Sequence, residues 1–209
     1  MNKSLVLEKT VSTSSQAILL IISGPTASGK TTLCDRMLET YQPAIQRVIT
    51  STTRAVRPGE INKRDYYFFT QEEFIRREQA GEFYETADVH GRRYGTLKSE
   101  IQSKLSQGID CLLNIDVQGA MAFFEAEAQD PLLSGRIHSV FIIPPDLDTL
   151  RNRLRERGES DPSEIERRLK SAEMEMSYAH HYAFQLKTTS RDADFSALQA
   201  YYNQIARPS

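Results

Sequence analysis

The sequence predicts an α/β fold with three layers, in which helices cover both faces of a mostly parallel sheet. Apolar runs of strand length alternate with segments of helical spacing along most of the chain, and this alternation is typical of parallel sheets packed between helices. The first apolar run, residues 17–22, leads directly into the glycine-rich stretch 24–32, which a helical pattern follows. A strand, a glycine-rich turn and a helix in this order predict the fold of the P-loop NTPases.

The composition agrees with one soluble globular domain. The chain has 209 residues, of which 39% are hydrophobic and 26% charged, and its net charge is −2. This balance argues against general binding to nucleic acid or to a membrane surface, and no apolar run reaches the roughly 18 residues that cross a membrane. Cys34 and Cys111 are not spaced as metal ligands and fall within predicted core elements, so a reducing, cytoplasmic location is expected.

Residues 1–16 are polar and rich in Ser and Thr, and we expect a flexible tail before a domain that spans residues 17–207. Within the first half of that domain, Thr70-Gln71-Glu72-Glu73 forms a capping box, and Gly81 follows as a stop signal. The predicted strands are 17–22, an extended segment from 48, 66–69 and 83–89, and the predicted helices are 33–41, 70–81 and 97–105.

In the second half, strand and helix patterns alternate more regularly. Pro144 and Pro145 end the apolar run 139–143, and Asp146 or Asp148 is expected to cap the following helix. The predicted strands are 111–116, 139–143 and 183–187, and the predicted helices begin near 117 and cover 150–157, 164–182 and 195–205, with a polar break at 158–162.

The stretch 24–32 reads GPTASGKTT, which matches the phosphate-binding pattern Gly-x-x-x-x-Gly-Lys-[Ser/Thr]. Its glycines let backbone N–H groups point at anionic oxygens, and the helix that starts near Lys30 adds a positive N-terminal dipole. Lys30 can reach the β- and γ-phosphates, and the Thr31 hydroxyl can bind Mg²⁺. The residues expected to hold a nucleoside triphosphate are Gly24, Pro25, Thr26, Ala27, Ser28, Gly29, Lys30, Thr31 and Thr32.

The region 49–96 has short strands and turns, and we expect it to be an insertion that binds a second ligand. It reads TSTTRAVRPGEINKRDYYFF from Thr50 and GEFYETADVHGRRYGT from Gly81. A carboxylate such as that of Glu85 accepts hydrogen bonds from both N1–H and N2–H₂ of guanine, whereas adenine presents an acceptor at N1 and leaves the carboxylate unmatched. Taken singly, the arginines also fit a solvated basic loop and the tyrosines a strand core.

These motifs resemble those of guanylate kinases, and the resemblance runs from about residue 18 to near residue 187. In that family the pattern Ser-x-Thr-Thr-Arg-x-x-Arg-x-Gly-Glu, an Asp-Tyr pair and a later Tyr-Gly-[Ser/Thr] build the GMP site. Here Thr50 replaces the first serine and keeps its hydroxyl. The resemblance implies that Arg54, Arg57, Tyr66 and Tyr94 bind the GMP phosphate, and that Thr50, Glu85, Thr96 and Asp116 contact the guanosine.

Four arginines lie within residues 151–157, and Arg153 and Arg157 share one helix face because they are four residues apart. In the family, matching arginines flank a mobile lid over the triphosphate, which implies a lid at about 153–168. Alongside Lys30, the resemblance implies catalytic roles for Arg153, Arg157 and Arg168, whose positive charge stabilises the transferred phosphoryl group.

The implied activity is transfer of the γ-phosphoryl group of ATP to GMP, giving ADP and GDP, with Mg²⁺, in cytoplasmic purine nucleotide metabolism. The expected partners are the two nucleotides, without nucleic acid or membrane, and the expected assembly is a monomer or a homodimer. Two alternatives stay open. One is a catalytically inactive binding module of the guanylate kinase type, and the other is a related P-loop kinase that acts on another phosphorylated acceptor.

Three stretches depart from the family pattern, and for one of them, Arg93 in place of a family tyrosine beside Tyr94, we expect little effect. Asn114 stands where the family often has the first residue of Asp-x-Asp, so one negative charge near the metal is missing; we expect activity to persist because asparagine keeps an oxygen acceptor. The stretch 187–192 reads KTTSRD, where the family usually has Asn-Asp-Asp beside the adenine. The sequence therefore gives less basis for ATP selectivity than for GMP selectivity.

Overall fold

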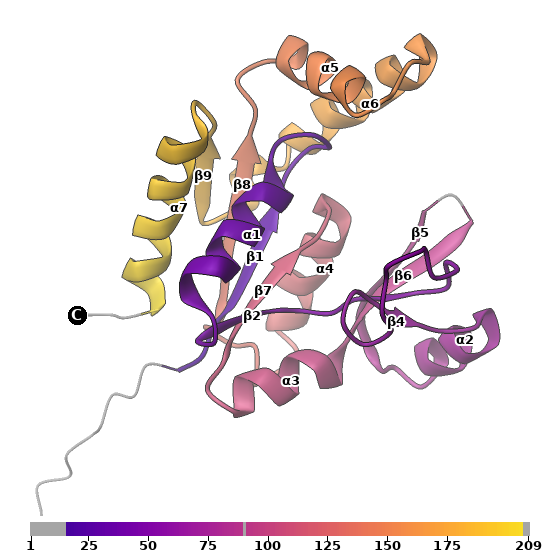
Figure 1. The fold of residues 1–209 in the computed structure, drawn as a ribbon. Coiled ribbons are helices and arrows are strands. Elements are labelled where there is room, and N and C mark those ends of the chain that lie inside the picture. The colour runs from indigo at the N-terminus through magenta and orange to yellow at the C-terminus, as the bar shows by residue number, and fades with distance from the viewer. Residues whose placement is uncertain (1–15, 90, 207–209) are drawn as a thin grey trace, which may run out of the picture.

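The computed structural model describes residues 16–89 and 91–206, which form two sheets with helices packed around them (Figure 1). The central sheet has five strands in the order β2-β7-β1-β8-β9, and all of its pairs are parallel. The strands are β1 (Leu19–Ser23), β2 (Ile45–Arg47), β7 (Asp110–Asn114), β8 (Ile137–Ile143) and β9 (Phe184–Lys187). The helices that cover them are α1 (Lys30–Tyr41), α3 (Lys98–Ser106), α4 (Val117–Glu127) and α7 (Arg191–Ala206).

Both faces of the central sheet are buried, because β1 alternates its side chains between two cores. Leu20 and Ile22 pack in a cluster with residues of α1 and α7. Leu19 and Ile21 pack in the opposite cluster with residues of α3 and α4. Every residue of β1 is buried, as expected for a central parallel strand. The predicted three-layer α/β fold is therefore confirmed.

A small sheet lies beside the central one, in the order β4-β3-β6-β5 (Figure 1). Its strands are β3 (Ser51–Thr52), β4 (Tyr67–Phe68), β5 (Phe83–Val89) and β6 (Arg92–Leu97), and helix α2 (Gln71–Gln79) packs against it. Strand β6 pairs antiparallel with both β3 and β5. Phe74 of α2 forms a separate core with Phe83 and Leu97. Gly95 must lack a side chain there, because a Cβ atom would lie 2.9 Å from the backbone oxygen of Glu85.

Helices α5 (Leu147–Glu156) and α6 (Pro162–Met176) form a hairpin beyond the carboxyl ends of the central strands, at the top of Figure 1. Leu150 and Leu154 of α5 pack with Ile165 and Leu169 of α6. Ala27 of the glycine-rich turn belongs to the same cluster, so the hairpin rests on that turn.

Most predicted elements are confirmed within a few residues, but one predicted helix was too long. The helix predicted at 164–182 ends at Met176, near which the Ser177 hydroxyl donates to the backbone oxygen of Met174 (2.7 Å), and the short 3₁₀ helix η1 (Ala179–His181) follows. The extended segment predicted from residue 48 contains β3, but only Ser51 and Thr52 of it form a strand.

Other sequence-based expectations have mixed outcomes. Cys34 and Cys111 are buried free thiols, as predicted. The tail predicted for residues 1–16 lies outside the described residues except for Gln16. None of the helices in the described part of the chain is long and apolar enough to cross a membrane.

Candidate active site

The glycine-rich turn connects β1 to α1, as the sequence predicts. Gly24 has φ +139°, and a Cβ atom there would lie 2.6 Å from the backbone oxygen of Ile142, so no other residue fits. Gly29 precedes α1 with φ +107°. The Ser28 hydroxyl is buried and has no hydrogen-bond partner within the described residues. A buried hydroxyl without a partner is unfavourable, and an anionic oxygen in the turn would satisfy it.

The ammonium group of Lys30 is folded back onto this turn. Its Nζ donates to the backbone oxygens of Gly24 (2.6 Å) and Pro25 (2.7 Å). Burial lowers the pKa of Lys30, and the nearby Glu175 and Asp116 carboxylates act against that shift. Two neutral carbonyls compensate a desolvated cation poorly, so phosphate oxygens are stronger partners for it.

A cleft of about 250 Å³ opens beside the turn, between α1, α5 and the start of α7. Arg153 donates from Nη1 to the backbone oxygens of Ala27 (3.1 Å) and Ser28 (3.3 Å), and Arg157 lines the same cleft. The structure therefore brings two of the three predicted lid arginines to the predicted triphosphate site.

Arg168, the third predicted lid arginine, does not line this cleft. It forms ion pairs with Glu159 (3.3 Å) and Glu164 (2.7 Å) of its own hairpin. Hydrogen bonds from Arg167 and Arg168 hold the pKa of Glu164 at about 2. Reaching the triphosphate thus requires Arg168 to leave these carboxylates.

The sequence did not predict a basic group at the far end of the cleft. Arg36 stacks over the Phe195 ring at 4.2 Å and donates to the backbone oxygen of Arg191 (2.8 Å). The Thr189 N–H donates to Asp194 (2.8 Å), which orders the chain ahead of α7. The atypical stretch 187–192 therefore leads into this end of the cleft. Arg36 follows Thr32 by four residues and so shares its face of α1, and this spacing was the signal in the sequence.

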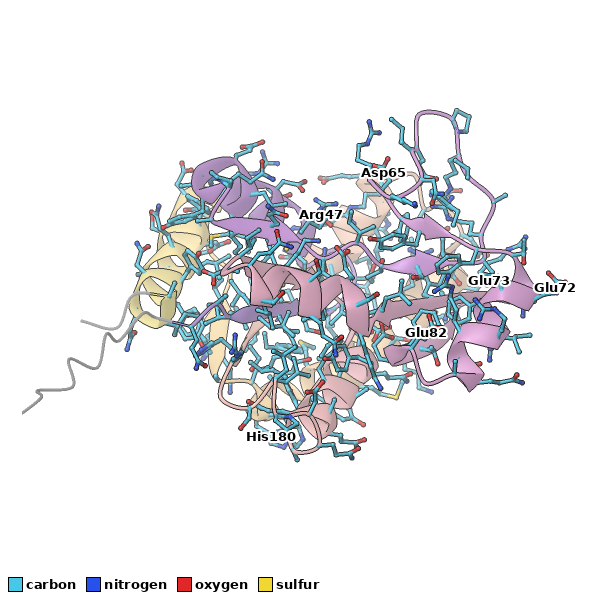
Figure 2. All side chains as sticks on the ribbon, turned by 90° about the horizontal axis from the view of Figure 1, so that it is seen from below. Arg47, Asp65, Glu72, Glu73, Glu82 and His180 are labelled. Carbon is cyan, nitrogen blue, oxygen red and sulfur yellow. The ribbon has the colours of Figure 1, made fainter. Side chains whose placement is uncertain are left out.

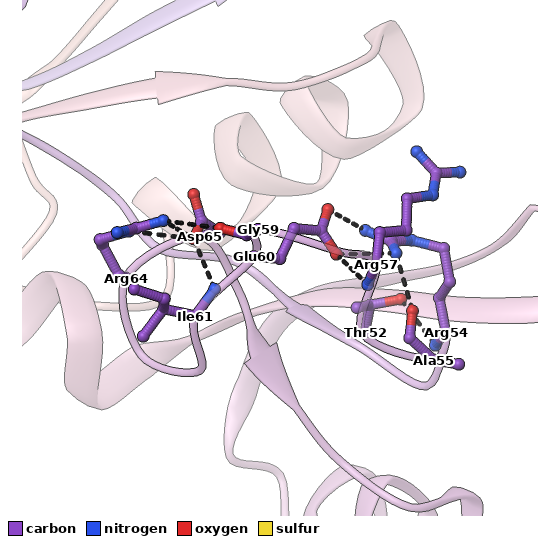
Figure 3. A network of polar contacts seen from close by, with 9 residues as sticks. All are labelled: Thr52, Arg54, Ala55, Arg57, Gly59, Glu60, Ile61, Arg64 and Asp65. Carbon is purple, nitrogen blue, oxygen red and sulfur yellow. Dashed lines mark hydrogen bonds and ion pairs between the residues drawn. The ribbon is translucent and has the colours of Figure 1, made fainter.

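In the small sheet, Arg54 forms a paired contact with Glu60 (Figure 3). Arg54 Nη1 lies 3.0 Å from Glu60 Oε2, and Nη2 lies 2.7 Å from Oε1. The backbone N–H of Arg57 also donates to Glu60 Oε2 (2.8 Å), while the Arg57 guanidinium points away from that carboxylate (Figure 3). These donors, Arg54 first, lower the pKa of Glu60 to about 2. The sequence placed Glu60 in a motif but assigned it no role.

Two predicted phosphate-binding tyrosines lie beside Arg54. The Arg54 guanidinium carbon is 5.4 Å from the centre of the Tyr66 ring, and the Tyr66 and Tyr94 rings meet edge to face at 6.3 Å. Tyr94 is on β6 and Tyr66 immediately precedes β4. Strand pairing thus gathers three of the four predicted phosphate ligands, which come from distant parts of the sequence.

Glu85 lies on β5 directly opposite Thr96 on β6, and the Thr96 hydroxyl donates to Glu85 Oε1 (2.6 Å). Burial raises the pKa of Glu85, the bond from Thr96 opposes this, and the nearby Asp116 charge adds to it. Asp116 caps helix α4 by accepting from the Gly119 N–H (2.8 Å). Thr96 is fully buried, so its contact orients Glu85.

Thr50 lines a smaller cavity of about 110 Å³ with Tyr66 and Asn114. Arg47 and Asp65, labelled in Figure 2, line the same cavity from the central sheet and from the segment before β4. It lies at the junction of the two sheets. Within residues 16–89 and 91–206, no group of three or more His, Cys, Asp or Glu side chains is arranged to hold a metal ion.

Comparison with known proteins gives one consistent result. A family model described as guanylate kinase matches residues 16–204. A guanylate kinase of Wolbachia sp. subsp. Brugia malayi is 43% identical over 169 residues, which cover 81% of this chain and 83% of the relative. A guanylate kinase of Wolbachia pipientis wMel is 38% identical over 190 residues, 91% of each chain. The crystal structure of guanylate kinase from Anaplasma phagocytophilum superposes with a TM-score of 0.71 at 29% identity, covering 93% of this chain and 89% of that one.

Proposed function

The chain belongs to the guanylate kinase family, and from this premise we propose which residues carry its reaction. The protein is an enzyme that phosphorylates GMP at the expense of ATP. The observation that best supports the assignment of residues is the presence of two separate groups of cationic and hydrogen-bond-donating residues, namely the glycine-rich turn beside Lys30 and the cluster of Arg54, Tyr66 and Tyr94.

On the donor side, the triphosphate of ATP binds the turn 24–32. The N–H groups at the start of α1 and the Ser28 hydroxyl face its oxygens, and Lys30 exchanges two carbonyl contacts for phosphate contacts. Arg153 and Arg157 reach the same phosphates from α5, and Arg168 joins them when the hairpin, the proposed lid of about 153–168, closes. The adenine lies toward Arg36 and the start of α7.

On the acceptor side, the region 49–96 binds GMP. Arg54, Arg57, Tyr66 and Tyr94 bind its phosphate, because planar guanidinium groups and phenolic O–H groups together satisfy a dianion. Glu85 accepts from the guanine N1–H and N2–H₂, and Thr96 holds the carboxylate in place. Thr50 and Asp116 border the base and the ribose.

In the transfer step, an oxygen of the GMP phosphate attacks the γ-phosphorus of ATP. A P–O bond forms to that oxygen, and the bond between the γ-phosphorus and the β,γ-bridging oxygen breaks, which leaves GDP and ADP. The acceptor oxygen is already ionised, so no catalytic base is needed. The enzyme contributes alignment and positive charge from Lys30, Arg153, Arg157 and Arg168.

We propose that Mg²⁺ accompanies ATP and that the Thr31 hydroxyl, in the first turn of α1, binds it. Mg²⁺ usually keeps several waters and takes few protein ligands besides substrate phosphates, so a site with one protein hydroxyl fits its chemistry. When bound, the ion neutralises charge on the phosphates. Asn114 ends β7 nearby and offers an oxygen acceptor in place of a carboxylate. A cytoplasmic role in purine nucleotide metabolism, as a monomer or a homodimer, is part of the same proposal.

The test is a coupled assay of ADP release with ATP, Mg²⁺ and GMP, beside reactions with AMP, with a ribosyl phosphate and without acceptor. Release that depends on GMP is the expected outcome. Equal turnover with a ribosyl phosphate would contradict the role given to Glu85, since that acceptor has no base. Saturable GMP binding without turnover would contradict the catalytic roles given to Lys30 and the lid arginines.

A further inference from the structure

Two stretches of chain connect the central sheet with the small sheet, and one buried carboxylate joins them. Residues 48–50 lead from β2 to β3, and helix α3 begins at Lys98, directly after β6. Glu100, in the first turn of α3, accepts a hydrogen bond from the Ile49 N–H (3.0 Å). The outgoing and returning connections are therefore tied together at this carboxylate.

Glu100 also contacts the small sheet and its own helix. Its Oε2 accepts from the hydroxyl of Tyr67 on β4 (2.8 Å), and its Oε1 pairs with Lys104 one helical turn later. Glu100 is only 7% exposed. A carboxylate so buried is stable only while its partners remain, so the three contacts hold Ile49, Tyr67 and Lys104 in one arrangement.

Ile49 occupies the point at which the chain passes from one sheet to the other. The N–H of its neighbour Val48 donates to Leu112 of β7 (2.9 Å), in the central sheet. The backbone oxygen of Thr50 accepts from the N–H of Tyr67 (2.9 Å), in the small sheet. Glu100 therefore binds the one residue between these two hydrogen bonds. A change in the backbone angles of that residue would move the small sheet relative to the central sheet.

We propose that Glu100 is a positioning residue that sets the small sheet, and with it bound GMP, relative to the glycine-rich turn. This rests on the proposed function, in which the donor binds the turn and the acceptor binds the small sheet. Arg54, Tyr66, Glu85 and Tyr94 all belong to the small sheet or its loops, so loosening this contact keeps these four GMP ligands together and misaligns the acceptor with the donor at the turn.

The signature of such a role is a loss of turnover without a loss of binding. In Glu100→Gln, the amide is a weaker acceptor for Ile49 and Tyr67 and no longer pairs with Lys104. We expect kcat to fall by about tenfold, because misplacing reacting groups by about 1 Å can cost up to about 100-fold in rate. The dissociation constants of GMP and of ATP stay within about twofold of the parent values, since neither site contains Glu100.

Asp110 provides a matched control. It accepts from the Ile18 N–H (2.9 Å) and from the Tyr202 hydroxyl (2.6 Å), the same two kinds of donor that Glu100 has, but both lie in the central sheet and its helices. Asp110→Asn is expected to lower the melting temperature and to leave kcat unchanged. If Glu100→Gln keeps kcat, or weakens GMP binding in step with kcat, the proposal is overturned.

Tyr67→Phe keeps the ring and removes only the hydroxyl donated to Glu100, so it decides the question if Glu100→Gln does not fold. It is expected to lower kcat by about threefold, in line with loss of one hydrogen bond of modest strength, with unchanged GMP affinity. A Tyr67→Phe protein with the parent kcat would contradict the proposal.

A distance measurement separates the proposal from the enzyme activity. Spin labels on Glu39→Cys in α1 and Glu72→Cys in α2 report the two sheets, since both positions are exposed and the native cysteines are buried (Figure 2 labels Glu72). Glu100→Gln should broaden the distance distribution, and Asp110→Asn should not. A broadened distance distribution in a protein that does not phosphorylate GMP would support the positioning role of Glu100 and reject the proposed function. An unchanged distribution in an enzyme that phosphorylates GMP would reject only the positioning role of Glu100.

Discussion

The glycine-rich turn and the small sheet both carry positive charge, but they build it from different parts of the chain. The turn uses backbone N–H groups at a helix start, and its lysine rests on two neutral carbonyls. The small sheet uses long side chains, and its Arg54 already holds the Glu60 carboxylate. Under the proposed assignment, phosphate would displace weak partners at the turn, whereas in the small sheet it would have to join an existing ion pair.

The difference also concerns what each site depends on. The turn is a local structure, fixed by Gly24 against Ile142 and by the start of α1. The acceptor site exists only when β3, β4, β5 and β6 are paired in register and oriented against the central sheet. A substitution in the turn should therefore lower the rate of phosphoryl transfer and leave GMP binding unchanged. A substitution in the small sheet should instead change which acceptor is used.

The largest expected effect is that of Lys30→Met, which removes the charge at the turn. We expect kcat to fall by about 1,000-fold, the upper range for loss of one preorganised electrostatic group, while the dissociation constant of GMP stays unchanged. Steady-state kinetics and calorimetric titration of GMP measure the two quantities. Lys170→Met, on the exposed face of α6, is the control and should keep the parent kcat. Weaker GMP binding in Lys30→Met would show that the two sites are not independent.

The same contrast explains how far the sequence led. The place of the turn between β1 and α1 could be predicted, because its nine residues are contiguous and follow an apolar run. The strand β6 escaped prediction, because Arg92 and Arg93 interrupt its apolar pattern and its burial comes from the neighbouring strands. Glu60 and Glu100 escaped for a related reason. Their partners Arg54, Ile49 and Tyr67 are brought to them by turns and by sheet pairing that no sequence spacing reveals.

Helix boundaries failed where tertiary structure decided them. The periodic pattern continues past Met176, but the chain must turn there to enter β9, and the Ser177 hydroxyl bonds back to the helix. For Arg168, the helix was predicted correctly but the contacts of the side chain were not. Its position on α6 follows the predicted helix, but its pairing with Glu159 and Glu164 depends on how the hairpin is folded.

A smaller effect is expected at the base-binding end of the small sheet. Glu85→Gln replaces a double acceptor with one acceptor and one donor, so the amide cannot match both guanine N–H groups. We expect kcat/KM for GMP to fall by about 100-fold, which is modest for a site built to bind a polar edge, and the preference for GMP over AMP to shrink. Glu72→Gln, at an exposed position of α2 outside the site, is the control. An unchanged ratio of GMP to AMP turnover would contradict the role of Glu85.

The smallest effect concerns stability, and it compares two carboxylates, Glu85 and Glu60, whose effects on stability change with pH in opposite directions. Burial raises the pKa of Glu85 in the folded protein, so folding favours its protonated form and the ionised form lowers stability at neutral pH. Removing that charge in Glu85→Gln should therefore raise the melting temperature at pH 7. The gain should fade as the pH drops to about 4, where the unfolded carboxyl is also protonated.

Glu60 should behave in the opposite way. Arg54 holds its pKa at about 2, so the ionised form stabilises the fold above the unfolded pKa, and this stabilisation is lost as the pH falls toward 2. Glu60→Gln should therefore lower the melting temperature at pH 7 and converge with the parent in acid. Melting curves followed by circular dichroism measure both variants. The range from pH 3 to pH 7 spans the pKa of an unfolded carboxyl group, which is about 4. If Glu85→Gln melts below the parent at neutral pH, the surroundings of the Glu85 carboxylate stabilise its ionised form. That result would contradict the inference that burial of this charge lowers the stability of the fold.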